Sequence, residues 1–196
     1  LRDFTINAMA ISIHAPHTLV DPLGGAGDLI ARRLRVCSPE SLIHDPLRIL
    51  RAVRQAVDFD LRITPETIQL MRQATGRLGQ VSSERIRDEI FRILDGSSPR
   101  SAIEILDRIG ALALVLPELG ALKGVEQSAP HIYDVWTHTL EVVKKLSAVY
   151  ATLSLDYDAD AAANLMQGLV SLRLGRYRQA LKDHLEEKLN PERSIR

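Results

Sequence analysis

The sequence has 196 residues, of which 45% are hydrophobic and only 4% aromatic, and its formal net charge is zero. A chain of this length buries a real core, and its composition favours packed helices over aromatic-rich strands. With no net charge, any nucleic-acid site must be a local basic patch. The single cysteine, Cys37, excludes an internal disulfide and a multi-cysteine zinc site and indicates a reducing, cytoplasmic setting.

The ends and the most apolar stretch of the chain bear on targeting. Residues 111–122 are the most apolar window, but they are about half as long as a membrane span, so no membrane segment is expected. No signal peptide pattern is present, and the first residue is Leu1 rather than Met. We therefore expect the chain to begin within a longer protein.

The first forty residues predict the flank of a β-sheet. The segment FTINAMAISI is rich in β-branched and apolar residues, LVDPLGG contains turn formers, and ARRLRVC can form another short strand. Between them, GGAGDLIA is expected to form a short helical connection. Residues 1–42 are accordingly assigned to part of a sheet-containing domain.

From Pro46 onward the hydrophobic periodicity is helical, with apolar residues at i, i+3 and i+7 (Leu50, Val53 and Val57). The next helix opens with Thr64 as N-cap and Pro65 at its first position. Further helices are predicted over residues 82–94, 98–110 and 133–153, and a last pair, broken near Gly175, reaches residue 188. The fold class is therefore mainly α with a short β-rich start.

A boundary is predicted where GVEQSAP, residues 124–130, interrupts the helices. It separates a helical neck and body, residues 43–123, from a helical C-terminal region, residues 124–196.

The segment HDPLRILRAVR, residues 44–54, places Arg48, Arg51 and Arg54 on one arc of a helix whose opposite side is apolar. Asp45 and Arg48 are three residues apart, so both can project toward one ligand. An acceptor beside a donor matches the Watson–Crick edges of cytosine and adenine and mismatches those of guanine and uracil. Arg51 and Arg54 would then hold phosphates or backbone. The alternative is a solvated face, with Asp45 only a helix cap.

Four motifs, in order and spacing, carry a family resemblance: RDFTINAMA, LVDPLGGAGDLIARRLR, HDPLRILRAVR and SSERIRDEI. Over about residues 2–95 the chain resembles the class II tRNA nucleotidyltransferases, which include CCA-adding enzymes and bacterial poly(A) polymerases. The resemblance implies an RNA nucleotidyltransferase that uses ATP and CTP and acts on the tRNA 3′ end. It also implies that residues 1–42 are part of the nucleotidyltransferase head.

The resemblance implies roles for the residues that match the motifs. Arg2 and Asp3 match the motif that recognises the ribose of the incoming nucleotide, and Asp45 and Arg48 match the protein template for its base. The family usually has Glu or Asp directly before that aspartate, whereas this chain has His44.

The two other motifs imply supporting roles. Asp28 and Arg32 match a flexible element that links the head to the helices. Glu84 and Arg85 match a motif that braces the template helix, although an ordinary exposed helix start is the alternative.

The family's chemistry uses two Mg²⁺ ions held by a pair of aspartates that follow a Gly-Ser. No such arrangement occurs in the 196 residues. DFD at 58–60 and DYDAD at 156–160 are interpreted as capping or solvated acids at helix ends. We therefore expect neither catalytic carboxylates nor metal ligands in this chain, and expect it to be a fragment that does not incorporate nucleotides alone.

A second chemistry is considered at HIYDVWTHTL, where His131, Asp134 and His138 are similar to the start of an HD phosphohydrolase domain. The completing His-Asp pair is missing, because only Asp183 and His184 follow, in reverse order. The favoured interpretation is structural, with Trp136, Leu140 and Val143 packed into the helical body and the histidines at its edge. The alternatives to the polymerase are thus a catalytically inactive RNA-binding fragment and a degenerate HD-domain protein, and the oligomeric state is left open.

Overall fold

The computed structural model describes residues 2–15, 17–153, 165–185, 187–190 and 193–194. The chain divides into two compact units, residues 1–137 and 138–196. Residues 1–42 and 43–123, which the sequence assigned to separate parts, lie together in the first unit. The expected fold class is confirmed, because helices dominate and the described strands are two or three residues long.

The N-terminal segment contains less strand than its composition predicts. It folds as the 3₁₀ helix η1 (Thr5–Asn7) followed by β1 (Ala10–Ile11), which pairs antiparallel with β2 (Leu19–Val20). The expectation of a strand through FTINAMAISI is therefore wrong for its first half. Side-chain bonds explain the difference: the Thr5 hydroxyl donates to Asp28, and the η1 turn places Phe4 and Thr5 in the core.

Helix α1 (Gly25–Ile30) confirms the expected short helical connection. Asp21 caps it, since its two carboxylate oxygens accept from the backbone nitrogens of Gly25 and Ala26 at 2.7 and 2.9 Å. At Gly25 the backbone of η1 comes so close that a Cβ atom would lie 2.2 Å from the Thr5 carbonyl oxygen. Only glycine lets α1 pack against η1 in this way.

The helices of the first unit form where the periodicity indicates. They are α3 (Arg48–Asp58), α4 (Pro65–Ala74), α5 (Ser83–Leu94) and α6 (Pro99–Arg108). The predicted Thr64 cap is confirmed, because its hydroxyl accepts from the Thr67 nitrogen at 3.3 Å. Helix α6 ends before Gly110, whose φ of 81° is the left-handed conformation typical of a helix terminus.

Several short elements were not predicted. They are β4 (Arg62–Ile63) and the helices α2 (Pro39–His44), η2 (Thr75–Gln80), α7 (Leu112–Val115) and α8 (Pro117–Gly120). Strand β4 pairs in parallel with β3 (Arg33–Leu34), which confirms the short strand expected in ARRLRVC. Two to six residues are too few to show a periodicity, and the parallel pairing of β3 with β4 depends on the intervening helices α2 and α3.

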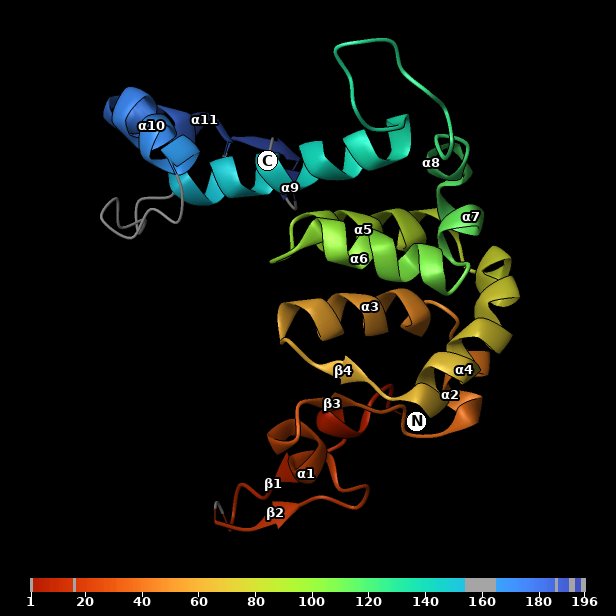
Figure 1. The fold of residues 1–196 in the computed structure, drawn as a ribbon. Helices are drawn as coiled ribbons and strands as arrows, with labels where there is room; N and C mark the ends of the chain where they lie inside the picture. The colour runs from red at the N-terminus through yellow and green to blue at the C-terminus, as the bar shows by residue number, and fades with distance from the viewer. Residues whose placement is uncertain (1, 16, 154–164, 186, 191–192, 195–196) are drawn as a thin grey trace. The chain divides into compact units, whose positions relative to one another are not determined.

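Helix α3 lies at the centre of the first unit, between β4 on one side and α5 and α6 on the other (Figure 1). Its apolar face is buried as expected, with Ile49, Leu50 and Val53 fully enclosed. Each such side chain contributes about 1.5–3 kcal/mol on burial. Burial of the apolar face fixes how α3 is rotated about its axis. The direction of the opposite face, which carries the arginines, is therefore fixed as well.

The second unit is helical in its described part. Helix α9 (Val135–Leu153) begins in the first unit and is followed by α10 (Leu165–Leu174), η4 (Gly175–Tyr177), α11 (Arg178–Leu185), β5 (Lys188–Asn190) and β6 (Arg193–Ser194). The expected break at Gly175 is confirmed, whereas DYDAD at 156–160 lies outside the described residues. Among the helices described, none combines the length and apolar character needed to cross a membrane.

Candidate nucleotide-binding site

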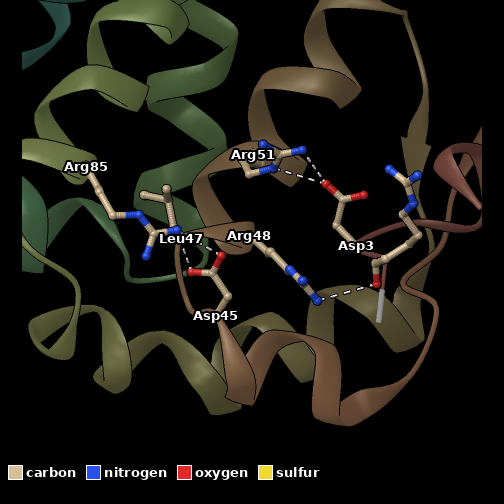
Figure 2. A pocket seen from close by; sticks show the side chains of 7 residues that line it. Asp3, Asp45, Leu47, Arg48, Arg51 and Arg85 are labelled. Atoms are coloured by element: carbon tan, nitrogen blue, oxygen red, sulfur yellow. Dashed lines mark hydrogen bonds and ion pairs between the residues drawn. The ribbon is translucent and has the colours of Figure 1, made fainter.

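A polar cavity of about 310 Å³ opens where the N-terminal segment meets the start of α3 and α5 (Figure 2). Its lining consists of Arg2, Asp3, Asp45, Leu47, Arg48, Arg51 and Arg85. Four arginines and two aspartates give this lining a net charge of +2. The cavity is therefore suited to an anionic ligand that also offers hydrogen-bond donors.

Asp3 is a buried carboxylate whose two oxygens are both hydrogen-bonded. Oδ1 accepts from the Phe4 nitrogen at 2.9 Å and from Asn7 Nδ2 at 3.0 Å, and Oδ2 accepts from Nε and Nη2 of Arg51 at 3.0 and 2.6 Å. Burial acts to raise the pKa of Asp3, but the bonds from Asn7, Arg51 and Phe4, with the charge of Arg51, lower it below its ordinary value. Asp3 is therefore a fixed negative charge at the cavity wall.

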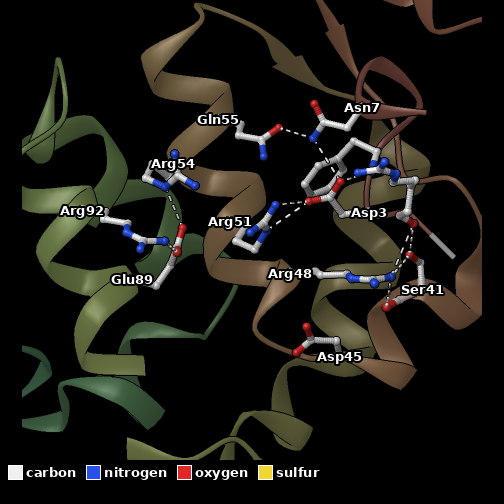
Figure 3. Close-up of polar contacts among 12 residues, drawn as sticks. Asp3, Asn7, Ser41, Asp45, Arg48, Arg51, Arg54, Gln55, Glu89 and Arg92 are labelled. Atoms are coloured by element: carbon white, nitrogen blue, oxygen red, sulfur yellow. Dashed lines mark hydrogen bonds and ion pairs between the residues drawn. The ribbon is translucent and has the colours of Figure 1, made fainter. Parts of the chain in front are cut away.

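Asn7 and Gln55 extend this network into the core (Figure 3). Asn7 Nδ2 donates to Gln55 Oε1 at 3.0 Å as well as to Asp3, and Gln55 is 6% exposed. Neither residue was predicted from the sequence. By helical period Gln55 falls on the arginine-bearing side of α3, so the sequence pattern carried no signal that Gln55 would be buried and paired.

Asp45 lies in the link between α2 and α3 and is paired with Arg85 from the first turn of α5 (Figure 2). Arg85 Nη2 is 3.1 Å from Oδ1 and 2.9 Å from Oδ2 of Asp45. The alternative of Asp45 as the side-chain cap of α3 is wrong, because the cap position is Leu47 and no side-chain cap bond forms there. Asp45 contributes only its backbone carbonyl, which accepts from the Arg48 nitrogen at 3.1 Å.

Arg48 lines the same cavity but its Nη1 points toward α2 (Figure 3). Nη1 donates to the Ser41 hydroxyl, to the Ser41 carbonyl at 3.1 Å and to the Arg2 carbonyl at 3.4 Å. These bonds connect α3 to α2 and to the N-terminal segment. The Asp45 and Arg48 side chains are thus held by different partners, one on each side of the cavity.

Arg54, which the sequence grouped with Arg48 and Arg51, is not part of the cavity lining. Its Nε lies 2.6 Å from Glu89 Oε1 in α5, and Glu89 also pairs with Arg92. Arg54 does follow Arg48 and Arg51 on the same face of α3, as predicted. It lies one turn further along the helix, however, and there this face packs against α5. In the structure Arg54 thus forms an ion pair with an acid of α5, and the expected phosphate contact stays a prediction.

The expected supporting residues lie outside the cavity, apart from Arg85. Asp28 is buried and accepts from Thr5 and from Arg35, so it anchors α1 to the chain around it. Arg32 has a positive φ of 49° and pairs with the exposed Asp60. Glu84 is exposed in the first turn of α5.

The described residues contain no group of three or more His, Cys, Asp or Glu that could hold a metal ion. Asp134 of the HD-like segment instead caps α9, accepting from the nitrogens of Thr137 and Gly124, each at 2.9 Å. Hydrogen bonding from Thr137 and Gly124 lowers the pKa of Asp134. Asp134 thus has a structural role at the start of α9.

Comparison with known families agrees with this arrangement. Residues 1–35 match the model described as "Poly A polymerase head domain", and residues 60–122 match "Probable RNA and SrmB- binding site of polymerase A". The cavity residues Asp45, Arg48 and Arg51 fall between these two matches. The chain belongs to the tRNA nucleotidyltransferase and poly(A) polymerase family.

Individual relatives give the same result. The chain is 42% identical over 163 residues to a multifunctional CCA protein of Neisseria gonorrhoeae, covering 81% of this chain and 39% of the relative. It is 39% identical over 150 residues to an A-adding tRNA nucleotidyltransferase of Deinococcus radiodurans, covering 74% and 34%. A solved tRNA nucleotidyltransferase, complexed with a primer tRNA and an incoming ATP analogue, superposes with a TM-score of 0.56 at 28% identity, covering 96% of this chain and 60% of that one.

Proposed function

We propose that this chain is the nucleotide-selecting and RNA-binding portion of an RNA nucleotidyltransferase of the CCA-adding or poly(A) polymerase type. The observation that carries the proposal is the single cavity that brings Asp3, Asp45, Arg48 and Arg51 together from separate segments of the chain. The chain spans about two fifths or less of the length of these relatives.

Base selection is assigned to Asp45 and Arg48. The Asp45 carboxylate accepts a hydrogen bond from the exocyclic amino group of cytosine or adenine, and Arg48 donates a hydrogen bond to the neighbouring ring acceptor. Guanine and uracil present a carbonyl oxygen where Asp45 requires a donor, so the carboxylate repels them. Cytosine and adenine satisfy the same two residues, and the cavity therefore fits C addition and A addition equally.

Asp3 and Arg51 are assigned to the sugar and phosphate side of the nucleotide. Asp3 already accepts four hydrogen bonds, which is about the capacity of a carboxylate. Direct acceptance from the ribose 2′-hydroxyl would require one of these donors to leave. Asp3 therefore acts first by holding Arg51 at the cavity wall, where its charge and that of Arg2 favour the triphosphate.

The Mg²⁺ ions that the family's chemistry requires do not fit the acids of this cavity. Asp3 is bound by Arg51 and Asp45 by Arg85, so each carboxylate already faces a cation. The residues described here thus bind and select the nucleotide, and no step of the phosphoryl transfer is assigned to them. Residues 60–122 are assigned to RNA binding, because the family model that they match is described as a probable RNA-binding site. The RNA substrate is assigned as the tRNA 3′ end. Cytoplasmic location stays a prediction.

The complete reading frame provides the first test. We expect a strand with Gly-Ser upstream, followed some ten or more residues later by two aspartates one residue apart. The product of that reading frame should label a tRNA 3′ end in the presence of Mg²⁺, whereas the 196-residue chain alone should not. Labelling by the chain alone, or an upstream sequence without these aspartates, would reject the proposal.

The second test concerns selection. In the product of the complete reading frame, Asp45→Ala should remove discrimination against GTP and UTP and lower the rate. A hydrogen bond to a charged group contributes about 1.5–3 kcal/mol, or roughly ten- to hundredfold. Asp88→Ala is the matched control, because Asp88 pairs with its neighbour Arg87 outside the cavity. Unchanged preference for C and A in Asp45→Ala would show that Asp45 does not read the base.

A further inference from the structure

Ser41 carries a buried hydroxyl where α2, α3 and the N-terminal segment meet. The residue lies within α2 and has no exposed surface. Its Oγ accepts a hydrogen bond from Arg48 Nη1 (Figure 3) and donates one to the Arg2 carbonyl oxygen at 2.8 Å. Arg2 and Arg48 both line the cavity, whereas Ser41 does not. The hydroxyl therefore joins two walls of the cavity from behind the lining.

Backbone oxygens complete the contact around Arg48 Nη1. The Ser41 carbonyl, near the end of α2, accepts from it at 3.1 Å, and the Arg2 carbonyl accepts from it at 3.4 Å. The carbonyl end of a helix has partial negative charge, which favours a cation there. Of these three oxygens, only the Ser41 hydroxyl belongs to a side chain. A substitution can therefore remove it and leave both backbone carbonyls in place.

We propose that Ser41 is a positioning residue for nucleotide selection, whose hydroxyl holds the guanidinium group of Arg48 in the orientation from which it donates to the base. The inference rests on the proposed function, since it requires Arg48 to read the base. An arginine side chain is long and has many rotamers, but its planar group carries its N–H donors in a fixed arrangement. Once Nη1 is held, the directions of the other N–H groups are set as well.

The same hydroxyl relates the base side of the cavity to its sugar side. Arg2 directly precedes Asp3, which the proposed function places beside the sugar and phosphates, and Arg48 faces the base. Because a nucleotide spans both sides, one hydroxyl bonded to Arg2 and Arg48 at once keeps the two sides in register. Ser41 lies outside the four sequence motifs and outside the family-model matches at residues 1–35 and 60–122, so this role comes from the structure alone.

The test compares Ser41→Ala with Thr152→Val in the product of the complete reading frame. Thr152 is also fully buried, and its hydroxyl donates to the Ala148 carbonyl at 2.8 Å within α9, outside the cavity lining. Each variant thus loses one buried hydroxyl. We expect Ser41→Ala to reduce the kcat/KM preference for ATP and CTP over GTP and UTP by about three- to tenfold, because a hydrogen bond that orients Arg48 is lost. Thr152→Val should leave this preference unchanged.

Two further variants separate positioning from a general loss of structure. Ser41→Thr keeps the hydroxyl and should keep the preference. In the double variant Ser41→Ala with Arg48→Ala, the preference should be no lower than in Arg48→Ala alone, since no guanidinium group remains to be oriented. A purely structural role would instead make Ser41→Ala slow all four nucleotides alike and leave their ratio unchanged. That result would overturn the inference.

Failure of this inference is distinguishable from failure of the proposed function. If Arg48→Ala leaves the preference for C and A intact, Arg48 does not read the base, and the role of Ser41 is wrong with it. If Arg48→Ala abolishes the preference while Ser41→Ala behaves like Thr152→Val, then the backbone carbonyls orient Arg48 without the hydroxyl, and only the present inference is rejected.

Discussion

Arg51 in α3 holds Asp3 in the N-terminal segment through two nitrogens that approach the same carboxylate oxygen, Nε at 3.0 Å and Nη2 at 2.6 Å. The second acid of the cavity, Asp45, is held by an arginine of another helix, Arg85. Each aspartate thus faces the cavity with its charge already paired. With Arg2 and Arg48 also in its lining, the cavity has a net positive charge, as expected for a site that binds a triphosphate and reads a base.

Arg51→Ala should lower the free energy of unfolding by about 1–3 kcal/mol, because a buried carboxylate loses two charge-assisted hydrogen bonds. Arg51→Lys keeps the charge but cannot supply both donors, and should recover part of the loss. Urea denaturation at pH 7 measures both variants. Equal stability of Arg51→Ala and the unchanged protein would show that Asn7 and the backbone satisfy Asp3 without Arg51.

Asp3 should make the stability depend on pH in the acid range. Burial raises the pKa of Asp3, but the bonds from Asn7, Arg51 and Phe4 outweigh it, so the folded-state pKa is below the unfolded value of about 3.9. The stabilisation is therefore present above about pH 4 and is lost as the pH falls through the folded-state pKa. Asp3→Asn should be less stable than the unchanged protein at pH 7, and denaturation at several pH values should show the difference shrinking below pH 4. A difference that stays constant with pH would contradict this linkage.

Arg54→Ala should act on stability, because it leaves the buried Glu89 without its closest cation. Loss of one partner from a buried ion pair costs about 3–5 kcal/mol, and we expect about 2–3 kcal/mol here since Arg92 also contacts Glu89. The double variant Arg54→Met with Glu89→Leu should regain most of the stability. If Arg54→Ala were instead stable and bound all four nucleotides more weakly, with less salt dependence, the phosphate role predicted from the sequence would be supported.

Gly25→Ala and Gly27→Ala should have opposite effects although they are two residues apart in α1. A methyl group at Gly25 would meet the Thr5 carbonyl oxygen at 2.2 Å, so we expect a loss of about 1–3 kcal/mol. Nothing lies within 4 Å of a methyl group at Gly27, where alanine should increase stability by roughly 0.5–1 kcal/mol. Thermal unfolding of the two variants tests the contact, and similar melting temperatures would show that α1 does not pack against η1 in this way.

The sequence by itself determined the helical class, the starts of α4 and α6, and the buried face of α3, because caps, prolines and a 3.6-residue period are local signals. It also indicated Asp45, Arg48, Arg51 and Arg54 as one group, since residues three apart share a helix face. The three-part domain division and the roles of the site residues remain predictions.

Only the tertiary structure decided which of these charges meet. Arg54 continues the same arc as Arg48 and Arg51, yet α5 packs against that turn and gives it Glu89 as a partner. Asp45 and Arg85, which form an ion pair, are forty residues apart in the sequence, and Asn7 and Gln55, which are hydrogen-bonded, are forty-eight residues apart. Pairings of this kind depend on how α3, α5 and the N-terminal segment pack, and a helical period describes only the face that each residue occupies on its own element.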